Sequence, residues 1–124
     1  MERARGQDFD APEGLLDIAD CVNAAGRVAL PPGTTLISLI DRNIANVGQT
    51  VAYRYLDFGR SPEGEVLELT WAQLDVRLRA IGSRVQQATS KGERVAILAP
   101  QGLDYVAGFY AAVKSGAIAV PLFA

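Results

Sequence analysis

Hydrophobic positions early in the chain repeat with the period of a helix. Across residues 34–48 apolar side chains recur every three to four positions, and Thr34 or Thr35 can cap the start of such a helix. Gly48 occupies the place of a C′ glycine at its end. The spacing predicts a helix here, with an apolar face made of Leu36, Leu39, Ile40, Ile44 and Val47.

The following residues alternate in the manner of strands. Residues 50–58 are rich in β-branched and aromatic side chains, and positions 51, 53 and 55 share one face. A polar turn with Pro62 and Gly64 then leads to a second such run at 65–69. This pattern predicts a β-hairpin with a longer loop.

A second helix is predicted directly after the hairpin. Thr70 and Gln73 have the spacing of a capping box. Residues 89–92 are superficially similar to a phosphate-binding loop, but they lack its run of glycines, so a helix end and a turn explain them better. The apolar stripe of this helix consists of Leu74, Leu78, Ile81 and Val85.

The last part of the chain reads as a βαβ unit. An apolar strand at 94–99, a turn at 100–102 and a helix at 103–115 are followed by a second apolar strand at 117–122. Both strands are apolar on both faces, as parallel strands covered by helices are. The predicted fold class is therefore α/β: a hairpin followed by a βαβ unit of an incomplete parallel sheet.

The N-terminal part gives weaker signals. Residues 1–18 show no sustained period and are expected to form a poorly ordered lead-in. Two short apolar runs, 21–23 and 27–30, flank a small turn and suggest a short hairpin closed by Pro31-Pro32-Gly33. A short helix over 14–25 is the alternative.

Composition excludes several classes of function. The chain has 124 residues and a net charge of −2, which does not favour binding to nucleic acid. It contains no histidine, and Cys21 is its one cysteine, so a Ser-His-Asp triad and an internal disulfide are excluded. Neither a secretory signal nor an apolar run of about 20 residues occurs, so we expect a cytoplasmic protein without a transmembrane segment.

The chain is more apolar than a small domain requires, and it ends directly after an apolar strand. With glycine counted and tyrosine left out, apolar residues make up about 56% of it, against about 45–50% in average globular domains. A single parallel strand pair with one helix leaves a sheet edge and a whole face open. We therefore expect residues 19–124 to be the first part of a larger domain, truncated at its C-terminal end. The alternative is a small obligate oligomer that covers the same surface with a copy of itself.

Residues that could carry chemistry mostly have structural interpretations. The turn Pro100-Gln101-Gly102 joins the carboxyl end of a strand to the amino end of a helix, where ligands bind in open α/β sheets, but a plain turn is the favoured interpretation. Lys114 suits the dipole at a helix end. We interpret Asp57, Asp75 and Asp104 as isolated carboxylates and Cys21 as an unreactive thiol. The basic side chains are expected to form the solvent-exposed face of a helix: Arg77, Arg79, Arg84, Lys91 and Arg94. Trp71, Tyr53 and Tyr55 are expected to pack as aromatic side chains. We therefore assign no catalytic and no metal-binding residue, and cofactor-binding residues stay unknown.

The order of these segments and their amino-acid sequences resemble one enzyme family. Residues 51–58, VAYRYLDF, and 69–74, LTWAQL, are similar to the opening of adenylate-forming enzymes. Residues 92–105, GERVAILAPQGLDY, and 111–122, AAVKSGAIAVPL, resemble in particular the fatty acyl-AMP ligases. The resemblance covers about residues 20–124.

The resemblance implies the first part of the large N-terminal domain of such a ligase. Complete members use ATP and Mg²⁺ to convert a fatty acid to an acyl-adenylate, then pass the acyl group to an acyl carrier protein, commonly on a polyketide synthase, for lipid biosynthesis. Their ATP-binding motifs and catalytic lysine lie later in the sequence. By this resemblance the segment alone is inactive, needs no cofactor of its own, and has the rest of its own domain as a partner. Two alternatives are a fragment of an acyl-CoA ligase and a non-catalytic interaction module.

Overall fold

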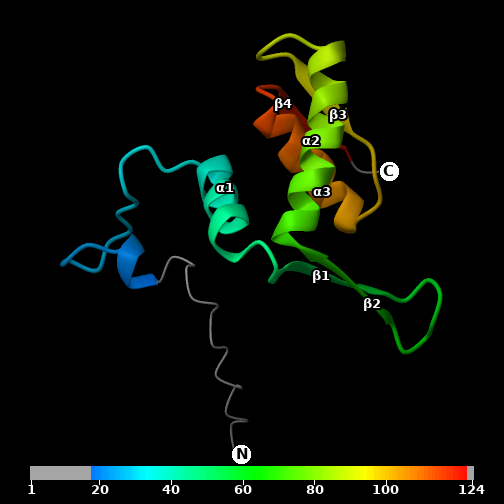
Figure 1. Ribbon diagram of the computed structural model, residues 1–124, viewed down its shortest axis with the longest axis horizontal. Coiled ribbons are helices and arrows are strands. Elements are labelled where there is room, and N and C mark those ends of the chain that lie inside the picture. Colours follow the sequence, from blue (N-terminus) through cyan, green and yellow to red (C-terminus); the bar gives the residue numbers. More distant parts are fainter. Residues whose placement is uncertain (1–17, 123–124) are drawn as a thin grey trace, which may run out of the picture.

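The computed structural model describes residues 18–122, which form helices around two small, separate pairs of strands (Figure 1). All but the last residue of the expected lead-in lies outside the described residues. None of the helices within 18–122 is both long and apolar enough to cross a membrane. The elements are η1 (Ile18–Cys21), α1 (Leu36–Val47), β1 (Val51–Asp57), β2 (Glu65–Thr70), α2 (Trp71–Ala88), β3 (Arg94–Ile97), α3 (Leu103–Lys114) and β4 (Ile118–Pro121).

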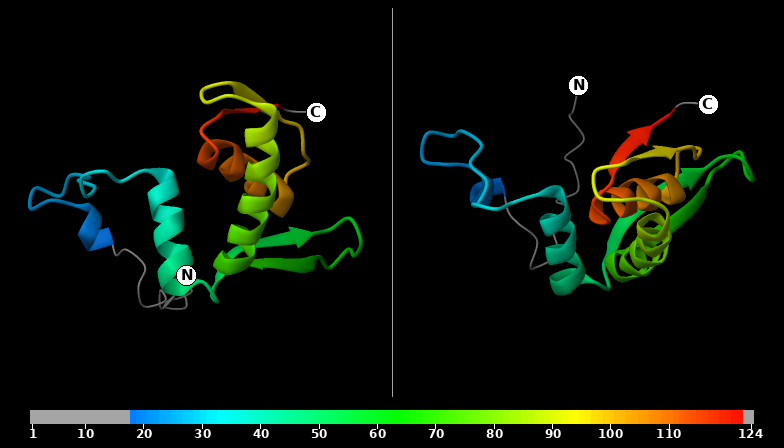
Figure 2. Two further views of the ribbon diagram at one scale, coloured as in Figure 1. Left: turned by 45° about the horizontal axis from the view of Figure 1, so that its top comes forward. Right: turned by 90° about the horizontal axis from the view of Figure 1, so that it is seen from above.

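The segment before α1 is a short arm that projects from the rest of the chain (Figures 1 and 2). Its predicted hairpin is confirmed in reduced form: Val22 and Val28 form one antiparallel bridge, and the Ala29 N–H donates to the Cys21 carbonyl at 2.8 Å. The alternative helix is limited to the four 3-10 residues of η1 within the described part. Its first positions, 14–17, lie outside that part.

Helix α1 begins where the sequence predicted. Thr35 is the N-cap: its hydroxyl accepts a hydrogen bond from the Ser38 N–H at 3.0 Å, and its own N–H donates to the Ser38 hydroxyl at 2.8 Å. Gly48 does follow the helix, but it is right-handed (φ −52°, ψ −31°) instead of the left-handed conformation of a C′ glycine. Space explains the glycine better, because a Cβ there would lie 2.8 Å from the Ile44 carbonyl oxygen.

The predicted hairpin is confirmed as an antiparallel pair of β1 and β2. Its register places Tyr53 opposite Leu69 and Tyr55 opposite Leu67, after an irregularity between Val51 and Tyr53. Residues 53 and 55 turn toward the helices, whereas Leu56, on the other face, is 51% exposed. The hairpin therefore contributes one face to the core.

Helix α2 has the predicted capping box. The Gln73 N–H donates to the Thr70 hydroxyl at 3.2 Å, and the Thr70 N–H donates to the Gln73 side-chain oxygen at 2.9 Å. Leu74 and Leu78 of the predicted stripe are fully buried. Gly82 is buried one turn further on, where α2 passes the backbone of α3 near Ala111.

The predicted βαβ unit is also confirmed. Strands β3 and β4 are parallel, with Arg94 opposite Ile118 and Ile97 opposite Pro121. Helix α3 packs on one face, where Ile97 is buried. The expectation that one face of the strand pair stays open is confirmed for the described residues: on the other face Leu98 is 73% exposed and Ile118 49% exposed.

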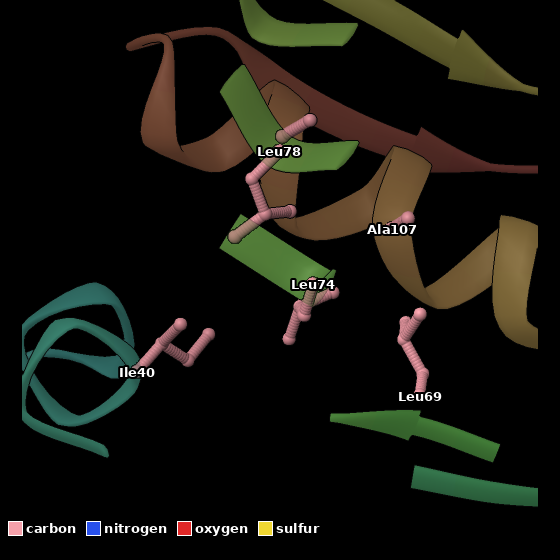
Figure 3. Close-up of a cluster of buried hydrophobic side chains, with 6 residues drawn as sticks. Ile40, Leu69, Leu74, Leu78 and Ala107 are labelled. Carbon is pink, nitrogen blue, oxygen red and sulfur yellow. The ribbon is translucent and has the colours of Figure 1, made fainter. Parts of the chain in front are cut away.

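The core lies where α1, α2, α3 and the hairpin meet (Figure 3). Alanines on α3 allow α2 and α3 to approach closely, and the large leucines of α2 fill the space between the other elements. The buried cluster consists of Ile40, Leu69, Leu74, Leu78, Ala107 and Ala111.

Candidate functional site

A groove of about 480 Å³ lies at the carboxyl end of β3. The hairpin supplies Tyr55 and Leu67, α2 supplies Arg77, and the segment 98–104 forms the remaining wall. This is the turn that the sequence placed at a typical ligand position of α/β sheets. The structure confirms the turn and shows that it borders this groove.

The shape of this turn depends on Gly102. Its dihedral angles, φ 157° and ψ −170°, belong to a region that is almost restricted to glycine. Gly102 is also the N-cap of α3, with no side chain to accept a hydrogen bond, and its carbonyl accepts one from the Val106 N–H at 3.2 Å. Glycine here lets the chain turn sharply from β3 into α3 beside the Tyr55 ring.

Charges at the rim of the groove neutralise each other. A guanidinium nitrogen of Arg77 donates to the Asp104 carboxylate at 2.7 Å, joining α2 to the first turn of α3. The Asp104 side chain is 91% exposed, so this ion pair contributes little to stability. Because the two charges are paired, the rim holds no free cation that is aimed into the groove.

Beside the groove, two tyrosines join the hairpin to α3. The hydroxyl groups of Tyr53 and Tyr110 lie 2.8 Å apart in a hydrogen bond. Burial, the hydrogen bond and the nearby Tyr110 hydroxyl all raise the pKa of Tyr53 well above the ordinary value for tyrosine. Tyr53 is therefore neutral at physiological pH and is suited to packing, not to acting as a base.

Asp57, Asp75 and Lys114 make local or interhelical contacts. Asp57 accepts a hydrogen bond from the Gly59 N–H at 2.8 Å at the start of the hairpin loop, and Asp75 pairs with Arg79 on α2 at 2.8 Å. Lys114 pairs with Asp41 of α1 in addition to lying at the end of α3. Each of these side chains thus has a partner within the described chain.

The aromatic and turn predictions are confirmed in part. Tyr53 and Trp71 pack edge to face with ring centroids 6.1 Å apart, whereas Tyr55 lines the groove. The Thr89 hydroxyl donates to the Val85 carbonyl at 2.7 Å at the end of α2, and Gly92 has a φ of 83° in the turn that follows. This turn is a helix end, not a phosphate loop.

Sequence reasoning missed the contacts between distant residues. The pairs Arg77–Asp104 and Tyr53–Tyr110 are 27 and 57 positions apart. No motif or period relates the members of either pair, so one sequence contains no signal for them. The sequence identified three of these four residues as candidates, but it did not predict which residues they contact.

The described residues do not fit an ATP or Mg²⁺ site. Residues 18–122 contain no buried polar or charged side chain and no group of three acidic, cysteine or histidine side chains that could hold a metal ion. The charged side chains that line the groove, Arg77, Asp104 and Glu68, are all ion-paired.

Similarity to known proteins gives the context of this scaffold. The AMP-binding enzyme family matches residues 40–124. The chain is 45% identical over 98 residues to the long-chain-fatty-acid–AMP ligase FadD32 of Mycolicibacterium smegmatis, covering 79% of this chain and 16% of the relative. It is 41% identical over 85 residues to FadD26 of Mycobacterium tuberculosis, with 68% and 15% covered.

Solved structures agree with these relatives. The fold matches part of a fatty acyl-adenylate ligase from Legionella pneumophila, solved with acyl adenylate and pyrophosphate, with a TM-score of 0.64 and 24% identity over 72% of this chain and 15% of that one. A fatty acid AMP ligase structure from the same organism gives a TM-score of 0.64 at 25% identity, with 71% and 15% covered. The predicted resemblance to fatty acyl-AMP ligases is thus confirmed, over a chain that spans about one sixth of the length of these relatives. With the family match over residues 40–124, these findings show that the chain belongs to the AMP-binding enzyme family.

Proposed function

We propose that this chain is the N-terminal segment of a fatty acyl-AMP ligase. The complete enzyme joins a fatty acid to ATP, forming an acyl-adenylate and releasing pyrophosphate, with Mg²⁺ as the metal ion. The observation that carries this proposal is the 45% identity to a long-chain-fatty-acid–AMP ligase over 98 residues. In this proposal the adenylate passes its acyl group to an acyl carrier protein of a polyketide synthase in the cytoplasm.

Within such an enzyme the described residues act as scaffold. Residues 19–124 are the first part of the large N-terminal domain, and ATP and Mg²⁺ bind to residues outside them. The paired charges of the groove and the fully apolar buried core support this division. The rest of the domain is then the first partner of this chain.

The decisive experiment begins with the genomic sequence after the codon for Ala124. If the reading frame continues, the whole encoded protein is purified and assayed for fatty-acid-dependent exchange of radiolabelled pyrophosphate into ATP. We expect exchange by the whole protein and none by the 124-residue chain, which serves as the matched control. An inactive but folded whole protein, or exchange by the 124-residue chain alone, would contradict the proposal.

The acceptor thiol is tested separately. Incubation of the whole protein with fatty acid and ATP, followed by either coenzyme A or a carrier protein with its phosphopantetheine arm, shows which thioester forms. We expect acylation of the carrier protein. Rapid formation of acyl-coenzyme A would assign the chain to an acyl-CoA ligase instead.

A further inference from the structure

We draw no further inference here: the strongest candidate, the groove between the β1–β2 hairpin, α2 and the β3–α3 turn, carries nothing, because its charged side chains are already ion-paired and nothing within the described residues shows what fills it.

Discussion

Leu74 is the side chain on which most of the core converges, and its truncation tests the account of the fold. It is 0% exposed and lies in one cluster with Ile40 of α1, Leu69 of β2 and Ala107 of α3 (Figure 3). Leu74→Ala removes the group that fills the space between these elements. The alanine on α3 is too short to fill the resulting cavity.

The expected loss of stability follows from transfer and cavity terms. Replacing a buried leucine by alanine costs about 2–5 kcal/mol, and a site between three rigid elements that cannot collapse belongs to the upper half of this range. For a chain of 124 residues the usual stability per residue gives a total of about 6–19 kcal/mol. Leu74→Ala therefore removes a large share of the stability.

Urea unfolding monitored by tryptophan fluorescence measures this loss. Trp71 is the one tryptophan, and it packs against the same core and against Tyr53. The matched control is Val76→Ala on the same helix, where the side chain is 67% exposed. The control should change stability by no more than about 0.5 kcal/mol, with all variants at one protein concentration because self-association adds to apparent stability.

Two results would refute the reasoning. A loss below about 1 kcal/mol for Leu74→Ala would mean that the site collapses, or that the elements do not meet there. An equal loss for Val76→Ala would mean that the exposed face of α2 is buried in solution.

Three further predictions concern single positions. Tyr53→Phe should lower the free energy of unfolding by about 0.5–1.5 kcal/mol through the lost bond to Tyr110. The fold raises the pKa of Tyr53, so the neutral form stabilises the native chain below about pH 10 and this contribution is lost above it. Urea titrations across that range should show a smaller loss for Tyr53→Phe than for the parent chain, and an equal loss would contradict the burial. Gly102→Ala should lower the melting temperature, since its backbone region costs other residues about 1–3 kcal/mol. Gly82→Ala should raise it, because the new Cβ lies 3.8 Å from the Ala111 oxygen and alanine favours a helix by about 1 kcal/mol; a lower melting temperature would show that α2 and α3 pack more tightly.

Local patterns predicted the elements because their causes are local. The capping box of Thr70 and Gln73 and the stripe through Leu74 and Leu78 lie within a few turns of one helix, so their spacing alone identifies α2. The register of the hairpin, in contrast, depends on an irregularity after Val51 that no turn signal indicates. The position of Gly48 after the helix predicted a left-handed cap, but its backbone is right-handed. A glycine is needed there because a Cβ would clash with the Ile44 carbonyl oxygen.

The sequence predicted the turn at 100–102, at a typical ligand position of α/β sheets, but it favoured a plain turn and did not predict the groove. Topology places the turn of Gly102 at the end of β3, which the order of strand and helix reveals. Its walls come from the hairpin and from α2, and the pairing of Arg77 with Asp104 is a tertiary contact. A sequence therefore locates such a site but gives neither its charge nor its shape.

The apolar surplus noted in the sequence has a structural explanation. Each strand of the βαβ unit is apolar on both faces, and α3 covers only the face that carries Ile97. The remaining apolar side chains lie on the open face, where Leu98, Ile118 and Leu122 are exposed. Strands that are apolar on both faces are typical of sheets that are covered on both faces, and in the described chain α3 covers one of them. The apolar surplus of the sequence therefore corresponds, in the described chain, to side chains on this open face of the sheet.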